Sequence, residues 1–315
     1  MSVLVYTESW EGKFRKSTYE AVSYASETAK LLGTDVVAIS FGNESDDELK
    51  TLGNYGANKV LASSGIEKGD SKDATHLFTT NASDASVIIF ASTYTSKMIA
   101  PRLAAKLKAG IVSNVISLPS STSPMQIKRK AFSNKALEIT TINTEKKIII
   151  LAPNAFGLVE SSGDCKIEKI EDDSDGSVTI NGQEVASGKV SLTEAEIIVS
   201  AGRGLKGPEN WKMIEELADL LGAATACSKP VSDIGWRPHG EHVGQTGKAV
   251  APNLYIAIGI SGAIQHLAGV NSSKVMVAIN TDPEAPFFKA ADYGIVGDAF
   301  EVVPKLIQEI KKLKN

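Results

Sequence analysis

The stretch "SVIIFASTYTSKMIAPRLAAKLKAG", residues 86–110, joins two different periodic patterns. It begins with an apolar, β-branched run that is typical of a buried strand. Over residues 96–109, Ile99, Leu103 and Leu107 then recur at helical spacing, with basic residues beside them. The stretch therefore predicts a strand followed by a helix that covers one face of a sheet.

The same alternation extends to both sides of this stretch. Strand-like runs occupy residues 2–6, 35–42, 58–63 and 110–118, and helix-length segments occupy residues 17–32, 45–53 and 71–83. Strands that alternate with helices predict βαβ units and a mainly parallel sheet, a Rossmann-like arrangement.

The pattern changes after this block. Three strand-like runs at 125–132, 136–144 and 146–153 follow one another with short connections, which predicts an antiparallel meander added to the first sheet. Residues 168–188 are rich in Asp, Glu, Ser and Gly and have too little apolar surface for a core element. We therefore expect the first domain to cover residues 1–190.

A second α/β block is expected over residues 191–315. Its strand-like runs lie at 196–202, 224–228, 254–259, 275–282 and 293–298, and its longer helices at 208–221 and 301–313. Each run ends in Gly, Ser, Asn or Asp, and the carboxyl ends of parallel strands border the ligand crevice of such sheets. The sequence thus predicts an α/β protein with two domains, each a mainly parallel sheet flanked by helices.

Composition narrows the classes of partner. The 315 residues carry a formal net charge of −4, which does not favour nucleic acid as a partner. The two cysteines form no C-x-x-C pair, and the apolar runs are shorter than the roughly 20 residues that span a bilayer. The first residues lack the pattern of a targeting peptide, so we expect a cytoplasmic protein, with the mitochondrial matrix as the less favoured alternative.

The segment "AGRGLKG", residues 201–207, has the G-x-G-x-x-G spacing of a dinucleotide-binding loop. That reading also requires an acidic residue at the end of the next strand, where this chain has Ser228 and Lys229. Arg203 and Lys206 instead suit a phosphate or pyrophosphate. An NAD(P) site, a phosphate site and a simple glycine turn all remain open from these residues alone.

The segment "EHVGQTGKAV", residues 241–250, lacks the full G-x-x-x-x-G-K-[ST] pattern of a nucleoside triphosphatase. Its glycines would let the backbone approach a flat ligand, with Gln245 and Thr246 as hydrogen-bonding groups. A mobile surface loop is the structural alternative.

The segment "GISGAIQHLAG", residues 259–269, follows a predicted strand and places one histidine among small and apolar residues. We expect Ser261 or Gly262 to cap a short helix, with Ile264 on its apolar face. His266 would point toward the strand ends, although a lone histidine in such a stretch is more often structural.

Hydrolase and metal chemistry receive little support. The chain has no G-x-S-x-G elbow, and His239 and His242 form an H-x-x-H pair within a Pro/Gly loop without a third ligand nearby. We therefore expect no catalytic triad and no metal site.

Taken together, residues 243–269 and 278–304 closely resemble the C-terminal flavin-binding domain of electron transfer flavoprotein alpha subunits. The similarity continues through "SAGRGLKGPENW", residues 200–211, and the N-terminal block looks like the family's first domain. The resemblance implies an FAD-containing redox carrier without substrate turnover of its own. It would form a heterodimer with a beta subunit and would not be inserted into a membrane.

The resemblance also implies an electron path. Electrons would come from flavoprotein dehydrogenases such as acyl-CoA dehydrogenases, as in fatty acid β-oxidation, and go to a quinone-linked oxidoreductase through a flavin semiquinone. A cation near the ring, either Lys229 or a protonated His266, would tune the flavin. A complex that bifurcates electrons or serves nitrogen fixation is a variant within the family. Outside it, the rivals are an NAD(P)-binding oxidoreductase and a nucleotide-binding regulator without redox function.

Family roles can be carried over to matching positions. The phosphates would lie beside Arg203, and the flavin would contact Ser228 and Lys229. The loop along the isoalloxazine would consist of Val243, Gly244, Gln245 and Thr246, with Thr246 at the N5 edge. The segment around the pyrophosphate and the ring's C2 carbonyl would consist of Ser261, Gly262, Ala263, Ile264, Gln265 and His266. Asn280 and Asp298 would hold the adenosine end.

One position departs from the family pattern. Many members have Ser-Arg where this chain has Ser228 and Lys229. Lysine keeps the charge but lacks the planar fork of a guanidinium. Either Lys229 acts alone at the flavin, or Arg237 reaches it from "GWRPHG".

Overall fold

The computed structural model describes residues 1–66, 69–132, 134–171, 178–179, 181 and 191–314. The described residues form two compact units, one on each side of residues 182–190. The predicted domain boundary near residue 190 falls within 182–190, outside the described residues, so its position remains a prediction.

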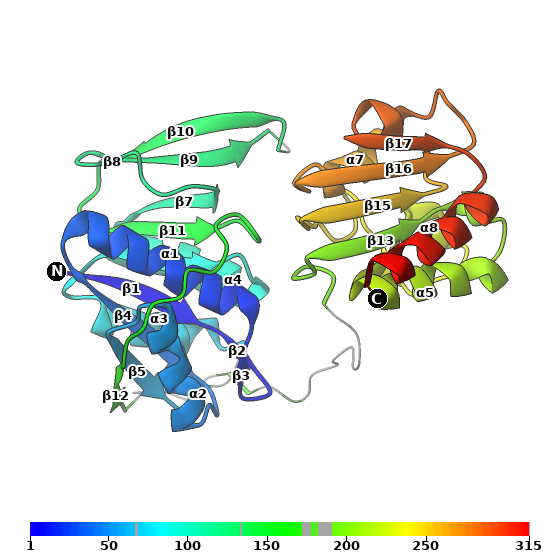
Figure 1. Ribbon diagram of the computed structural model, residues 1–315. Coiled ribbons are helices and arrows are strands. Elements are labelled where there is room, and N and C mark those ends of the chain that lie inside the picture. Colours follow the sequence, from blue (N-terminus) through cyan, green and yellow to red (C-terminus); the bar gives the residue numbers. More distant parts are fainter. Residues whose placement is uncertain (67–68, 133, 172–177, 180, 182–190, 315) are drawn as a thin grey trace. The chain divides into compact units, whose positions relative to one another are not determined.

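The first unit is built on a ten-stranded sheet (Figure 1). Its order is β10-β9-β7-β11-β6-β1-β4-β5-β12, with β8 paired to β9. The strands are β1 Ser2–Thr7, β4 Asp35–Phe41, β5 Lys59–Ser63, β6 Ala85–Ala91, β7 Gly110–Val115, β8 Ser121–Thr122, β9 Met125–Ala131, β10 Ala136–Ile142, β11 Lys147–Leu151 and β12 Lys166–Lys169. The run β5-β4-β1-β6 has the 3-2-1-4 order of a Rossmann sheet, which confirms the predicted class.

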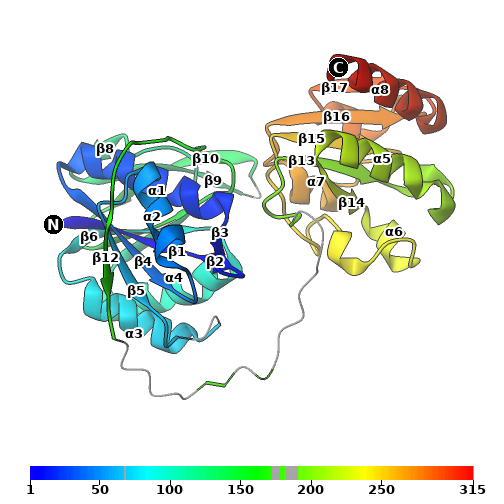
Figure 2. The same ribbon diagram turned by 60° about the horizontal axis from the view of Figure 1, so that its bottom comes forward.

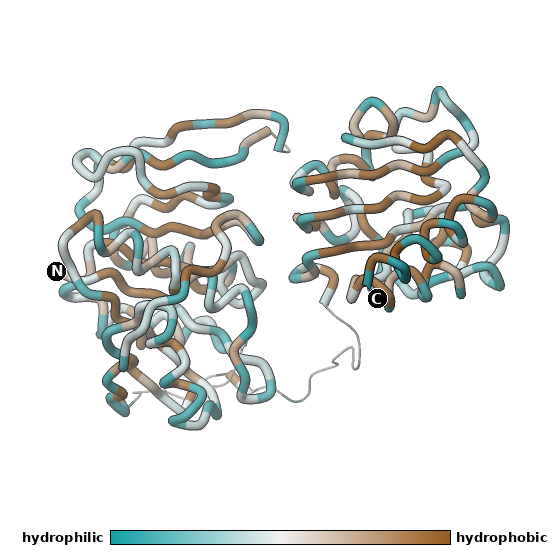
Figure 3. The backbone as a smooth tube through the Cα atoms, viewed as in Figure 1, coloured by the Kyte–Doolittle hydropathy of each residue, from teal (hydrophilic) through white to brown (hydrophobic). Residues whose placement is uncertain are grey.

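Helices cover both faces of this sheet because the central strands are apolar on both sides (Figure 3). In β1, Val3 and Val5 pack toward α1, whereas Leu4 and Tyr6 pack into the core shared with α3 and α4. The helical segments are α1 Lys16–Leu32, α2 Asp46–Lys50, the 3-10 turn Thr51–Tyr55, α3 Ser71–Asn81 and α4 Tyr94–Leu107. This is the packing expected of parallel strands buried on both faces.

The helix predicted from the opening stretch is present as α4. The Thr93 hydroxyl accepts a hydrogen bond from the backbone N–H of Ser96 at 3.1 Å and so caps the helix start. Ile99 and Leu103 are fully buried against the sheet, and Leu107 packs at the edge of the same core. The predicted strand and covering helix are therefore confirmed.

The predicted meander over residues 125–153 is wrong in one strand. β9 and β10 are antiparallel, as expected, but β11 runs parallel between β7 and β6. Four of its five residues are buried. The physical reason is that "KIIIL" has no polar side after its first residue, and such a strand is stable only in the centre of a sheet.

The acidic stretch from residue 168 also starts differently from the prediction. Glu168 and Lys169 belong to β12, a parallel edge strand beside β5. Glu168 forms an ion pair with Lys59 at 2.7 Å. A polar segment can pair at an edge because an edge strand keeps much of its surface in water. Most of the residues from 172 to 190 lie outside the described part of the chain.

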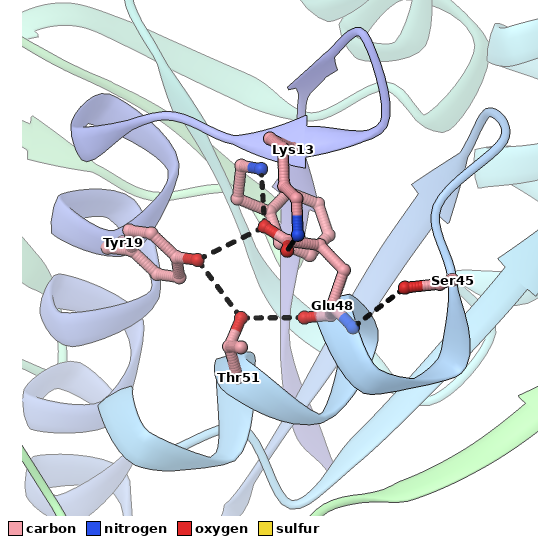
Figure 4. Close-up of polar contacts among 6 residues, drawn as sticks. Lys13, Tyr19, Ser45, Glu48 and Thr51 are labelled. Atoms are coloured by element: carbon pink, nitrogen blue, oxygen red, sulfur yellow. Dashed lines mark hydrogen bonds and ion pairs between the residues drawn. The ribbon is translucent and has the colours of Figure 1, made fainter.

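A short hairpin of β2 Ser9–Trp10 and β3 Lys13–Phe14 is fastened to α2 by Glu48 (Figure 4). The Glu48 carboxylate accepts hydrogen bonds from Lys13 Nζ at 2.7 Å and from the backbone N–H of Phe14 at 2.8 Å. A buried carboxylate needs such donors because burial without them is costly. This contact anchors the segment that follows β1.

The second unit contains a fully parallel sheet of five strands in the order β14-β13-β15-β16-β17 (Figure 2). The strands are β13 Ile197–Ala201, β14 Ala224–Cys227, β15 Leu254–Ile258, β16 Val275–Asn280 and β17 Tyr293–Val296. If these five strands are numbered from 1 to 5 in chain order, their order in the sheet is 2-1-3-4-5. The chain therefore turns to opposite sides of the sheet from β13 and from β15, and a crevice opens between their carboxyl ends.

Two cores cover the faces of this second sheet. Helices α5 Lys212–Leu221 and α8 Ala299–Lys314 pack on one face, and α7 Ile264–Val270 belongs to the other. The shorter pieces are α6 Lys229–Asp233 and the 3-10 turns Arg203–Leu205, Pro208–Trp211, His239–Glu241 and Pro286–Lys289. The predicted second α/β block is thus confirmed element by element. None of the helices in the described parts of the chain combines the length and apolar character needed to cross a bilayer.

Candidate functional site

Two glycine-rich strand ends meet at the crevice of the second unit. The N–H of Gly202, after β13, donates to the carbonyl of Ile258 at 2.9 Å, and the N–H of Gly204 donates to the carbonyl of Gly259 at 3.1 Å. A Cβ placed on Gly204 would lie 2.6 Å from the Gly259 Cα, closer than atoms can approach. Glycine is therefore required here because the two backbones touch.

A cavity of about 550 Å³ lies at these strand ends. Its volume is within the range of about 300–1,000 Å³ that is usual for cofactor pockets. Twelve of the fifteen predicted site residues line it: Arg203, Ser228, Lys229, Val243, Gly244, Gln245, Thr246, Ser261, Ala263, Gln265, His266 and Asn280. The structure thus brings together side chains from four strand ends and one loop, as the strand-end argument predicted.

Asp298 lies outside this lining. Its carboxylate accepts a hydrogen bond from the N–H of Phe300 at 3.0 Å at the start of α8, and it lies 3.4 Å from Lys206 Nζ. The Lys206 ammonium also lies 5.0 Å from the Phe300 ring centroid. Lys206, predicted as a second loop cation, is therefore placed with Asp298, and only Arg203 of the pair lines the cavity.

Gly262 and Ile264 also lie outside the lining, and the predicted cap of α7 is wrong. The N-cap residue is Ala263, and no side chain caps the helix. Gly262 has a φ of 84° and faces Phe287, whose N–H donates to the Ser261 carbonyl at 3.0 Å. The turn thus needs a left-handed glycine rather than a capping hydroxyl. Ile264, expected on the apolar face, is 66% exposed.

The loop over residues 242–248 is held in place by hydrogen bonds. The N–H of Val243 donates to the Cys227 carbonyl at 3.1 Å, and the N–H of Gln245 donates to the Gln265 carbonyl at 2.7 Å. A Cβ on Gly269 of α7 would lie 2.6 Å from the Gly244 Cα, so the loop packs directly on that helix. These contacts favour a fixed loop over the mobile-loop alternative.

His266 is buried, with an exposed fraction of 7%, and lies against the cavity. Its Nε2 is 3.0 Å from the Tyr255 hydroxyl, and its Nδ1 is buried without a partner among the described residues. Burial lowers the pKa of His266 to about 4, and the neighbouring His242 acts in the same direction, whereas an interaction with the Val243 backbone has the opposite, smaller effect. The imidazole is therefore neutral near pH 7.

Burial also raises the pKa of the Tyr255 phenol, so this group keeps its proton. The hydroxyl and Nε2 of His266 share one hydrogen bond, and its donor depends on the imidazole tautomer. In the tautomer in which the hydroxyl donates, Nδ1 carries the imidazole hydrogen and can donate to a ligand carbonyl.

Sequence reasoning missed several lining residues. His242 is 2% exposed and lines the cavity beside the loop that it precedes, whereas the sequence suggested it only as half of a weak metal pair. Its position directly before "VGQTG" was the available signal. The other missed lining residues are Gly204, Pro230, Gly259, Ile260, Asp282 and Ala285.

Of the two cations proposed to act at the flavin, Lys229 and Arg237, one lies at the cavity and the other does not. Lys229 lines the cavity. Arg237 does not, because its guanidinium donates to both carboxylate oxygens of Glu241 at 2.7 Å and to Glu215 at 2.9 Å. It also lies over the Trp211 ring at 5.3 Å. A guanidinium held by two carboxylates and a ring is not available at the cavity, so the Arg237 alternative lacks support.

The His239–His242 pair does not form a metal site. Their ring centroids are 5.5 Å apart. Over the ranges that the structure describes, no group of three or more His, Cys, Asp or Glu side chains is placed to hold a metal ion.

Comparisons with known proteins agree with this architecture. The model of the electron transfer flavoprotein domain matches residues 3–175, and that of the electron transfer flavoprotein FAD-binding domain matches residues 191–271. The second match covers all predicted site residues except Asn280 and Asp298.

Relatives match along almost the whole chain. An electron transfer flavoprotein subunit alpha of Bacillus subtilis is 39% identical over 99% of this chain and 98% of its own, and one of Syntrophomonas wolfei is 37% identical over 98% of each. Protein FixB of Clostridium saccharobutylicum is 33% identical over 99% of this chain and 96% of its own. Acinetobacter baumannii MurG, a solved structure, reaches a TM-score of only 0.31 at 11% identity, so it adds nothing to the argument.

Named alpha subunits are 37% and 39% identical over almost the whole chain, and the matched FAD-binding domain contains most of the cavity lining. The chain therefore belongs to the electron transfer flavoprotein alpha subunit family.

Proposed function

We propose that this chain holds FAD in the cavity at the β13–β15 crevice and carries electrons as one half of a heterodimer with a beta subunit. Its donors would be flavoprotein dehydrogenases such as acyl-CoA dehydrogenases, and its acceptor a quinone-linked oxidoreductase. We place it in the bacterial cytoplasm. The observation that supports this most is the cavity at the strand ends, which Arg203, Lys229 and the buried His266 imidazole line.

The residues present fit FAD. The touching glycines at the crevice leave the backbone exposed to a close ligand, as a pyrophosphate requires. Arg203 would pair with the phosphates, since a guanidinium matches their oxygens. Asn280 would contact the adenosine end. For Gly262, Ile264 and Asp298, support for a cofactor role comes from the family resemblance alone.

At the ring end, Gln245 and Thr246 lie on the loop that packs against α7 and would lie along the isoalloxazine. The Nδ1–H of His266 would donate to the ring's C2 carbonyl. When bound, the flavin supplies the ability to accept and release electrons singly, and the protein tunes it through hydrogen bonds and nearby charge. Because His266 is neutral, we assign the tuning positive charge to Lys229.

The NAD(P) alternative gains no support from the second unit. In a dinucleotide site an acidic side chain follows the second strand and binds the ribose hydroxyls. Here Ser228 and Lys229 follow β14, and Lys229 brings a positive charge to the cavity.

Co-expression of this chain with its beta subunit tests the proposal. A yellow heterodimer with a flavin absorbance spectrum, and one FAD per chain pair, is the expected result. A colourless complex, or a chain that binds pyridine nucleotide instead, would contradict it.

A matched pair of variants tests the charge assignment. Lys229→Met should lower the flavin's one-electron potential, by roughly 59 mV for about 1.4 kcal/mol of lost stabilisation. Arg237→Met should leave the potential unchanged while lowering the melting temperature, because it breaks the contacts with Glu215 and Glu241. The reverse pattern would return the role to Arg237.

A further inference from the structure

The His242 imidazole and the backbone of His266 both lie close to Gly244. A Cβ placed on this glycine would lie 3.4 Å from Nε2 of His242 and 3.7 Å from the Cα of His266. Both side chains line the cavity, with exposed fractions of 2% and 7%. His242 lowers the pKa of His266, because a positive charge on both imidazoles would be repulsive.

The two imidazoles differ in the hydrogen-bond partners of their ring nitrogens. In His266, Nε2 shares a hydrogen bond with the Tyr255 hydroxyl at 3.0 Å, and the Val243 backbone also interacts with the imidazole. In His242 the Nδ1 is buried beside Gly247, where an added Cβ would lie 2.8 Å away, and it makes no hydrogen bond with the described residues. His242 therefore keeps a nitrogen that is open to a proton.

The charged surroundings of His242 come from three elements. Asp233 of α6 favours its protonated form, whereas Lys229 of α6 and His239 of the preceding turn oppose it. His266 of α7 is the third neighbour, and its own pKa is lowered by His242. Burial is the largest effect and lowers the pKa of His242, so the imidazole is neutral in the protein as it stands. An added negative charge in the cavity would favour the protonated form of His242.

We propose that His242 is the group that takes up the compensating proton when the cofactor in this cavity gains an electron, while His266 stays a neutral hydrogen-bond donor. This inference rests on the proposed function. When the external donor delivers the first electron, one proton from solvent binds the open nitrogen of His242, and the net charge of the cavity is unchanged; His242 has no site for a second proton. On reoxidation the electron leaves to the acceptor and the proton returns to solvent.

The test is a histidine NMR titration of the FAD-loaded heterodimer, oxidised and then reduced with dithionite. The His242 signal is identified by its loss in His242→Gln, which keeps a polar side chain but cannot become charged. We expect the pKa of His242 to rise by about one pH unit or more on reduction, and that of His266 to stay below the titrated range. A pKa of His242 that is the same in both redox states overturns the inference.

Proton uptake during reduction gives a second readout. In weak buffer with a pH indicator, His242→Gln should take up fewer protons per electron than the parent, whereas the control His76→Gln should match the parent, because His76 is exposed on α3 of the first unit and does not line the cavity. Equal uptake by the parent and His242→Gln overturns the inference. A heterodimer without a flavin spectrum would instead overturn the proposed function, and this inference with it.

Discussion

The low pKa of His266 predicts a specific loss of stability in mild acid. An unfolded chain exposes this imidazole, which then titrates near its ordinary value of 6.5, whereas the folded chain holds its pKa at about 4. Between these values the unfolded state binds more protons than the folded state. Stability is therefore full above pH 6.5 and falls as the pH drops toward 4.

The size of this loss follows from the difference between the two pKa values. About 2.5 units at 1.36 kcal/mol per unit correspond to about 3 kcal/mol over the whole window, of which about 2 kcal/mol is lost by pH 5. The change His266→Gln removes the titrating group and should remove this part of the pH dependence, whatever it does to stability at pH 7.

Urea unfolding of the cofactor-free chain at pH 7 and pH 5 provides the assay. In a Trp10→Phe background, the remaining tryptophans, Trp211 and Trp236, both lie in the second unit and report its unfolding. The control His239→Gln removes an exposed imidazole from the same unit, and this variant should still lose stability between pH 7 and pH 5 as the parent does. If His266→Gln loses as much stability between the two pH values as the parent, the reasoning is refuted.

Three further changes test the packing. Gly204→Ala should lower the free energy of unfolding by about 1–3 kcal/mol and reduce the flavin content, because its Cβ would collide with the backbone after β15. The control Gly240→Ala should change neither quantity, because a Cβ there meets no atom within 4 Å. Glu20→Ala should lower the free energy of unfolding, measured in urea, by about 3 kcal/mol, because three backbone N–H groups lose their buried acceptor. The control Glu27→Ala, which removes a surface ion pair, should lower it by less than about 1 kcal/mol. Leu103→Ala should lower the stability of the first unit by about 2–5 kcal/mol, since the side chain is fully buried, and thermal unfolding checks it. A Leu103→Ala protein as stable as the parent would contradict the assigned core.

Local pattern predicted most of the elements because their residues repeat with a definite period. The helix after β6 and all five strands of the second unit follow from such repeats. The direction of β11 does not follow from its local sequence. Its uniform apolar run indicates a buried strand, but the direction of that strand depends on which neighbours pair with it, and that information is not local.

The candidate site divides in a similar way. Small and polar residues after the strands predicted the place of the crevice, and the family resemblance named twelve residues that do line one cavity. His242 was missed as a cavity residue because its role depends on the bridge between Cys227 and the loop start, two segments fifteen residues apart.

The sequence by itself determined the α/β class, the alternation of strands with helices and the family, because these depend on residue order and short-range periodicity. The tertiary structure alone decided the charges and partners at the site. It buries His266 against Tyr255 so that the imidazole is neutral, holds Arg237 between Glu215 and Glu241, and leaves Lys229 at the cavity. Burial and hydrogen bonding set the protonation and position of a side chain, and both arise only when distant segments pack together.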